Sequence, residues 1–198
     1  MTATEEALVF MRRNIDACWP QIEAGVEAIV MTARGCGAHV RDYGHLLRDD
    51  PQYRDKAQHV SELTRDIAEV VTQEWQDGVL PASSGAPRRI AFQSPCSLQH
   101  GQKLNGVVEK LLKRAGFRLA PVAYPFLCCG SAGSYSILQP ALAESLRERK
   151  LETLLATRPS LIATANIGCL MHLAAASPVP VGHWIELLDE TLAPGDTP

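Results

Sequence analysis

The 198-residue sequence lacks a long apolar run and an excess of either charge. No apolar stretch approaches the roughly 20 residues of a membrane-spanning helix. With 19 Lys and Arg against 22 Asp and Glu, the chain has no basic stripe for nucleic acid. Neither a Gly-x-Gly-x-x-Gly motif nor a Walker loop occurs. The sequence therefore predicts no transmembrane segment, no nucleic-acid partner and no nucleotide site.

A secretory signal is also missing. Arg12-Arg13 is followed by Asn14-Ile15-Asp16, which supplies neither the apolar core nor the cleavage site of a twin-arginine signal. Because 46% of the residues are apolar, the chain can bury a sizeable core without disulfide bonds. We expect a globular cytoplasmic protein, with a peripheral position at the inner membrane as an alternative, whose six cysteines serve metal or redox chemistry.

Four of the cysteines form a Cys, Cys-Cys, Cys series. Cys96 lies 32 residues before the pair Cys128-Cys129, and Cys169 lies 40 residues after it. Adjacent thiols serve one site only where the backbone turns sharply, and Gly130 and Gly133 permit such a turn. Four thiolates hold either an iron–sulfur cluster or a structural zinc, although zinc more often uses Cys-x2-Cys knuckles, which are absent from the sequence.

The second part of the chain alternates between predicted strands and helices. Because parallel strands end at one edge of a sheet, the first three strands should bring Cys96, Cys128-Cys129 and Cys169 together. The alternation predicts an α/β fold with a parallel sheet covered by helices on both faces. Strands are expected at 89–93, 117–122, 161–165 and 179–181, and helices at 102–115, 137–156 and 184–192.

The first part of the chain is predicted to contain fewer strands than the second. It is followed by a Ser-, Gly-, Ala- and Pro-rich stretch at 78–87, which predicts a surface linker. The predicted elements are short helices at 4–24 interrupted by Pro20, a buried strand at 26–32, and helices at 36–47 and 52–75.

An internal repeat links the two parts. An offset of 133 superposes Cys36 on Cys169 and His39 on His172. The same offset would place the counterparts of the other site cysteines before residue 1, so we expect the chain to begin inside a first repeat. The predicted organisation is a partial repeat over 1–77, a linker over 78–87 and a complete cysteine-rich domain over 88–198.

Three motifs resemble the cysteine-rich CCG domain in order and spacing: Pro95-Cys96, Cys128-Cys129-Gly130 and Asn166-Ile167-Gly168-Cys169-Leu170-Met171-His172. This family includes heterodisulfide reductase subunits, lactate-utilisation proteins and the iron–sulfur subunit of glycolate oxidase, which the flanking sequence resembles most. The resemblance implies a CCG-domain-like fold and a [4Fe-4S] cluster held by Cys96, Cys128, Cys129 and Cys169. It also implies that the chain is the C-terminal part of such a subunit.

The implied function is electron transfer by a non-catalytic subunit of an oxidoreductase. Electrons would come from a flavin on partner subunits, where glycolate is oxidised to glyoxylate, and would leave towards the membrane quinone pool. Whether the chain is itself an enzyme stays open. One alternative is a non-redox assembly module whose cysteines hold zinc or nothing. Another is a subunit of a lactate-utilisation or heterodisulfide-reductase-type complex.

The remaining candidates are weaker. His172 stands where several CCG proteins carry a further cysteine, so it is a candidate metal ligand, although a hydrogen-bonding role is commoner for such a histidine. Cys36 and His39 are expected to be the remnant of a first-repeat site. Cys18 is expected to be structural, and His100 to be exposed at a helix start or to donate a hydrogen bond near the site.

Overall fold

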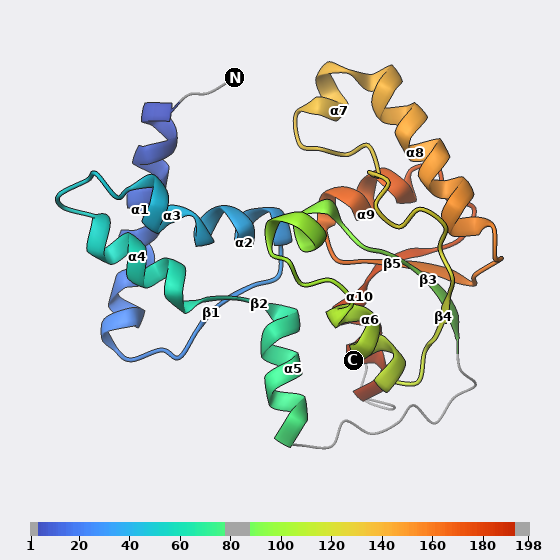
Figure 1. Ribbon diagram of the computed structural model, residues 1–198, viewed down its shortest axis with the longest axis horizontal. Helices are drawn as coiled ribbons and strands as arrows, with labels where there is room; N and C mark the ends of the chain where they lie inside the picture. The colour runs from blue at the N-terminus through green and yellow to red at the C-terminus, as the bar shows by residue number, and fades with distance from the viewer. Residues whose placement is uncertain (1–3, 78–87, 193–198) are drawn as a thin grey trace, which may run out of the picture. The chain divides into compact units, whose positions relative to one another are not determined.

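The computed structural model describes residues 4–77 and 88–192 (Figure 1). The chain divides into two compact units, Met1–Val70 and Val71–Pro198, which are considered separately. The predicted linker at 78–87 lies outside the described residues. The assignment of 1–77 to a partial repeat and of 88–198 to a complete domain stays a prediction.

A four-stranded parallel sheet forms the centre of the second unit. Its strands are β3 (Arg89–Gln93), β4 (Arg118–Ala120), β5 (Leu161–Thr164) and β6 (Val181–His183). Their order in the sheet is β4-β3-β5-β6. The central strands β3 and β5 are buried at every position after their first residue, as expected for parallel strands covered on both faces. The predicted parallel α/β architecture is confirmed.

Helices cover both faces of this sheet (Figure 1). On one face α6 (Val107–Arg114) contacts α10 (Trp184–Leu192), and on the other α8 (Pro140–Leu155) contacts α9 (Ile167–Ala174). The connection from β3 to β4 crosses the sheet in one direction and the connection from β4 to β5 crosses it in the other. Since such crossovers are right-handed, the two directions place α6 and α8 on opposite faces.

Two helices predicted for the second unit are shorter than expected. The helix predicted at 102–115 begins only at Val107, because the backbone is left-handed at Lys103 (φ 57°) and Gly106 (φ 76°). A short π-helical turn, η1 (Ser97–Gly101), precedes that stretch.

The helix predicted at 137–156 is divided into α7 (Tyr135–Leu138) and α8. The residue before a proline avoids the helical region, and Gln139, which precedes Pro140, has φ −133° and ψ 60°. Proline fits well at the first position of α8, where no backbone N–H is needed.

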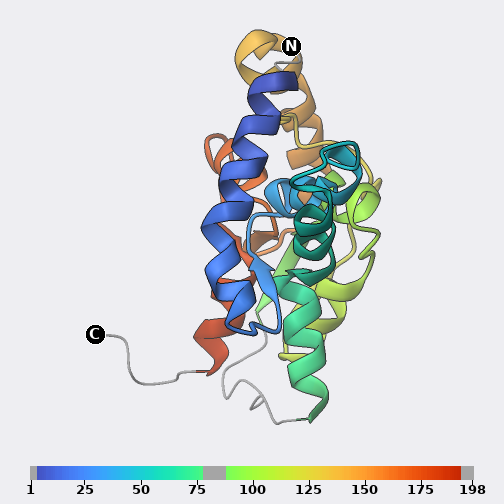
Figure 2. The ribbon, with the colours of Figure 1, turned by 90° about the vertical axis from the view of Figure 1, so that its left-hand side faces the viewer.

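Residues 4–77 form a two-stranded parallel sheet and five helices, the last of which, α5 (Ile67–Asp77), crosses the boundary between the two units. Figure 2 shows the long helix α1 along its length. Its buried side chains, Met11 and Ile15 among them, pack with Tyr43, Leu47 and Val60 in the core of the first unit. The elements are α1 (Thr4–Glu23), β1 (Ile29–Met31), α2 (Arg34–Arg41), α3 (Tyr43–Leu46), α4 (Arg54–Leu63), β2 (Thr64–Asp66) and α5 (Ile67–Asp77).

Three predictions for this unit are wrong in detail. Helix α1 continues through Pro20, because a proline in the last turn removes only one helical hydrogen bond. The helix predicted at 36–47 is two helices that meet at Asp42. The helix predicted at 52–75 is divided by β2, which pairs with β1. This tertiary pairing overrides a continuous apolar stripe in the local sequence.

The two units share a local arrangement. Strand β1 and helix α2 correspond to β5 and α9 at the offset of 133 found in the sequence, and the two helices have the same length. The next strand leads into a helix with the same cap in each unit. The Asp66 N–H donates to Glu69 Oε2 at 2.8 Å, and the His183 N–H donates to Glu186 Oε2 at 3.1 Å. A side chain three residues ahead thus caps each strand-to-helix junction in the same way.

Candidate metal centre

The carboxyl ends of β3 and β5 lie side by side where the strand order reverses. This reversal is the point at which open α/β sheets place their ligand sites. Strand β3 leads to Cys96, and β5 leads through Asn166 to Cys169. The loop that follows β4 carries Cys128-Cys129.

Two of the four predicted cysteines are in direct contact. Cys129 Sγ and Cys169 Sγ lie 2.9 Å apart and share a hydrogen bond. Both residues are buried in the apolar cluster between the sheet and helices α8 and α9. Cys128 is half-buried and Cys96 is exposed. Within residues 4–77 and 88–192, no group of three or more His, Cys, Asp or Glu side chains is arranged so that it could hold a metal ion.

The thiols influence one another electrostatically. The hydrogen bond with Cys169 lowers the pKa of Cys129 to about 7. The same hydrogen bond, together with burial, raises the pKa of Cys169. Burial raises the pKa of Cys128, and the charge of Cys96 contributes to the raised pKa of both Cys128 and Cys169. The exposed Cys96 is therefore close enough to act electrostatically on Cys128 and Cys169.

Gly130 sets the path of the Cys-Cys loop. Its φ is 90°, and a Cβ at this position would lie 2.2 Å from the Ala143 carbonyl oxygen of α8. The Gly130 N–H donates to Cys128 Sγ at 3.4 Å, so the turn also directs a backbone donor at one thiol. Gly133 is left-handed too, with φ 58°. The predicted glycine turn is confirmed.

Helix α9, which the sequence did not predict as a helix, positions Cys169. The Asn166 side chain caps the helix, because its Oδ1 accepts from the N–H of Gly168 at 2.9 Å and of Cys169 at 3.3 Å. A Cβ on Gly168 would lie 2.7 Å from Ser131 Oγ, which shows how closely α9 approaches the Cys-Cys loop. An asparagine directly after a buried strand was the sequence signal for this helix start.

His172 joins α9 to α8. Its Nε2 lies 3.2 Å from the Ala143 carbonyl oxygen, to which it donates when that nitrogen is protonated. Because Nε2 makes this contact, only Nδ1 has a lone pair available to bind a metal. The geometry fits the hydrogen-bonding role that is commoner for such a histidine, and ligation by His172 stays a hypothesis.

The carbonyl oxygen of Pro125 connects three segments of the site. It accepts from Gln99 Nε2, which follows Cys96 in the chain, at 3.2 Å and from Lys150 Nζ of α8 at 3.0 Å. Gln99 Nε2 also donates to the Ser94 carbonyl at 2.8 Å. The sequence interpretation missed both side chains. The sequence contains no signal for Lys150, because a lysine that follows Arg149 in a helix is typical of a solvent-exposed position.

The other candidates lie elsewhere in the chain. Cys36 and His39 belong to α2 of the first unit, where both are exposed and the His39 ring meets the edge of Tyr43. Cys18 is half-buried against the core of that unit, which agrees with a structural role. His100 is exposed on η1.

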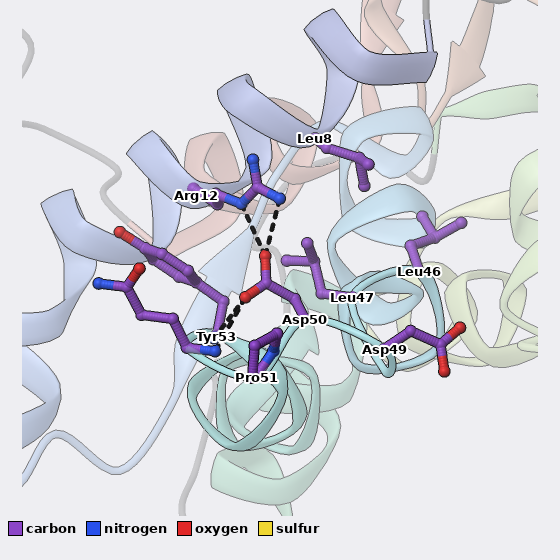
Figure 3. Close-up of a pocket in the computed structure, with 9 residues that line it drawn as sticks. Leu8, Arg12, Leu46, Leu47, Asp49, Asp50, Pro51 and Tyr53 are labelled. Carbon is purple, nitrogen blue, oxygen red and sulfur yellow. Dashed lines mark hydrogen bonds and ion pairs between the residues drawn. The ribbon is translucent and has the colours of Figure 1, made fainter.

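A hollow of about 720 Å³ opens on the first unit (Figure 3). Arg12 Nε donates to Asp50 Oδ2 at 2.8 Å, and Asp50 Oδ1 accepts from the backbone N–H groups of Gln52 and Tyr53. Apolar side chains, Leu8 among them, complete the lining. The charges of Arg12 and Asp50 are paired with each other, and none of the nine lining residues is a cysteine, so the hollow is not part of the thiol chemistry.

Comparison with known proteins supports the cysteine-rich assignment. Residues 90–174 match the family described as "CCG: Cysteine-rich domain". This segment contains all but the first residue of β3, all of β5 and all four cysteines of the site. The match agrees with the motifs found in the sequence.

The full chain is similar to longer proteins. It is 48% identical over 192 residues to the glycolate oxidase iron-sulfur subunit of Escherichia coli K12, an alignment that covers 97% of this chain and 46% of that protein. It is 30% identical to a probable glycolate oxidase iron-sulfur subunit of Bacillus subtilis, over 75% of this chain and 33% of that one. Lactate utilization protein A of an Exiguobacterium species is 25% identical, over 85% of this chain and 70% of that one. The chain thus spans less than half the length of the two glycolate oxidase relatives.

Among solved structures, an aspartate racemase homologue from Pyrococcus horikoshii aligns over 96% of this chain and 78% of its own. Its TM-score of 0.35 and identity of 16% are too low to support any inference. In the part of the chain that the structure describes, no helix is both long enough and apolar enough to span a bilayer.

Proposed function

We propose that this chain is the cysteine-rich, electron-transferring portion of an iron–sulfur subunit in a glycolate oxidase-type complex. Cys96, Cys128, Cys129 and Cys169 would hold a [4Fe-4S] cluster. The observation that carries the proposal is the buried contact of Cys129 with Cys169, which joins two chain segments 40 residues apart at the edge where the sheet order reverses.

The residues of the site fit such a cluster. Four thiols from three segments are the soft donors that iron–sulfur clusters use. Lys150, whose side chain is fully buried, brings a positive charge close enough to act on Cys128, Cys129 and Cys169. None of the ion pairs among the described residues includes Lys150. A cluster with four thiolate ligands is anionic and would supply the opposite charge that this buried ammonium lacks.

A bound cluster would accept and release single electrons. The chain would hold it through thiolates, limit water at the buried pair Cys129 and Cys169, and direct the Gly130 N–H at Cys128 Sγ. Hydrogen bonds to ligating sulfurs tune the potential of a cluster. In this role the chain itself carries electrons and does not bind the α-hydroxy acid.

The proposed partners follow from the similarity to the E. coli subunit. Electrons would come from flavin-bearing subunits that oxidise glycolate to glyoxylate, and would pass towards the membrane quinone pool. A lactate-utilisation complex is the alternative context, favoured by the similarity to lactate utilization protein A. The 48% identity to the glycolate oxidase subunit, against 25%, makes the first context the preferred one.

Anaerobic purification of the full chain followed by metal and sulfide analysis tests the proposal. About four iron and about four sulfide per chain, with a broad visible charge-transfer band, are expected for a [4Fe-4S] cluster. Cys129→Ser is the negative control and Cys18→Ser the matched control that should keep the cluster. Stoichiometric zinc, or no metal in protein prepared anaerobically with iron and sulfide supplied, would support the assembly module instead.

A further inference from the structure

Lys150 is one of the largest fully buried side chains of the described structure, with no exposed surface. It lies on the face of α8 that packs towards the core, on the same stripe as Ala143, Leu151 and Leu154. A lysine there costs free energy, because burial disfavours its charged form. A methionine or leucine would cost less, so packing alone does not explain this residue.

The surroundings of Lys150 offer one acceptor and several thiols. Its Nζ donates to the Pro125 carbonyl oxygen at 3.0 Å, three residues before Cys128. Burial lowers the pKa of Lys150, and the negative charges of Cys129, Cys169 and Cys128 raise it, in that order of size. The negative charges that favour the charged form of Lys150 are therefore those of the sulfur atoms of the site.

We propose that Lys150 sets the reduction potential of a cluster held by the four cysteines, by supplying a buried positive charge that favours the reduced state. This inference rests on the proposed function. It assigns a potential-setting role to a residue outside the cysteine motifs.

The direction of the effect follows from Coulomb's law. One-electron reduction adds one negative charge to the cluster and makes or breaks no bond in the protein. A fixed cation nearby stabilises the reduced state more than the oxidised state, and the effect is larger in a buried site than in water. Helix α8 and the hydrogen bond to Pro125 hold the ammonium in place, so the charge cannot move away into solvent.

The test compares Lys150→Met, which removes the charge at similar length, with Lys150→Arg, which keeps it. Lys110→Met removes a charge from an exposed position on α6 and is the matched control. Each full-length variant is reconstituted anaerobically, its iron and sulfide are measured, and its cluster is titrated with dithionite in the presence of redox mediators. The reduced cluster is quantified by electron paramagnetic resonance at each potential.

Lys150→Met should lower the potential by at least 59 mV, which is a tenfold change in the equilibrium constant of a one-electron couple. Lys150→Arg and Lys110→Met should stay closer to wild type than that. Equal potentials in Lys150→Met and wild type, at equal iron content, would overturn the inference and leave the proposed function intact. A wild-type chain that binds no iron would instead overturn the proposed function.

Lys150→Met could also lose its cluster, and the rate of iron loss to a chelator then gives the comparison. If charge is what matters, Lys150→Arg should lose iron at the wild-type rate and Lys150→Met at least tenfold faster. Equally fast loss in both variants would show that the shape of the lysine matters and its charge does not, which would overturn the inference. Urea unfolding of the apoproteins checks that the fold of each variant is intact.

Discussion

Gly130 is the position where the structure predicts the largest effect of adding a single methyl group. The residue follows the Cys-Cys pair with φ 90°, a conformation that L-residues rarely adopt. A Cβ there would also lie 2.2 Å from the Ala143 carbonyl oxygen and 3.0 Å from His172 Nε2. The Ala143 carbonyl oxygen belongs to the backbone of α8 and cannot rotate away. Gly130→Ala must therefore displace either the helix or the loop.

The magnitude combines two costs. A left-handed conformation costs an L-residue ~1–2 kcal/mol. Forcing an extra methyl group into packed surroundings typically costs a further ~1–3 kcal/mol. Gly130→Ala should therefore lower the free energy of unfolding by about 2–5 kcal/mol. Gly133→Ala is the matched control, because Gly133 is left-handed in the same loop but its added Cβ would meet nothing within 4 Å. It should cost only ~1–2 kcal/mol.

Urea unfolding of the apoprotein measures both costs. In a Trp19→Phe background, fluorescence reports the buried Trp75 and Trp184, which both belong to the second unit. The difference between the two glycine variants isolates the contact with Ala143, since both carry the backbone strain. Equal destabilisation by the two substitutions would refute the close approach of the Cys-Cys loop to α8.

Three further predictions concern the cluster and the first unit. Cys128→Ser and Cys129→Ser should each abolish the cluster absorption band, because a hydroxyl is a poor substitute for a thiolate on iron, whereas Cys18→Ser should leave it intact; a full band in either of the first two would argue against shared ligation. His172→Gln should keep the iron content and shift the potential modestly, because an amide can still donate to the Ala143 carbonyl; lost iron or a large fall in potential would establish His172 as a ligand. In hydrogen exchange, the backbone amides of β1 should be less protected than those of the covered strand β5, because β1 belongs to a two-stranded sheet and its Val30 is 44% exposed. Strong and equal protection of both strands would contradict this.

The sequence alone determined the parallel sheet and predicted that its strand ends bring cysteine segments together, as the structure does for Cys129 and Cys169. Strands β3 and β5 are short apolar runs that lead directly into Cys96 and towards Cys169, and parallel strands must end at the same edge. The glycine turn after Cys128-Cys129 was also predictable, since only glycine adopts a positive φ without cost. These features depend on local chemistry and on a general rule of chain topology.

Only the tertiary structure decided the rest. Strand β2 lies within a helical apolar pattern and becomes a strand because β1 offers it hydrogen bonds from more than 30 residues away. Lys150 looks like a surface residue between Arg149 and Leu151, yet the packing of α8 buries it beside the thiols. Gly130 must be glycine for its contact with Ala143 as well as for its own backbone angle. In each case the deciding partner is distant in the sequence, so no local pattern contains it.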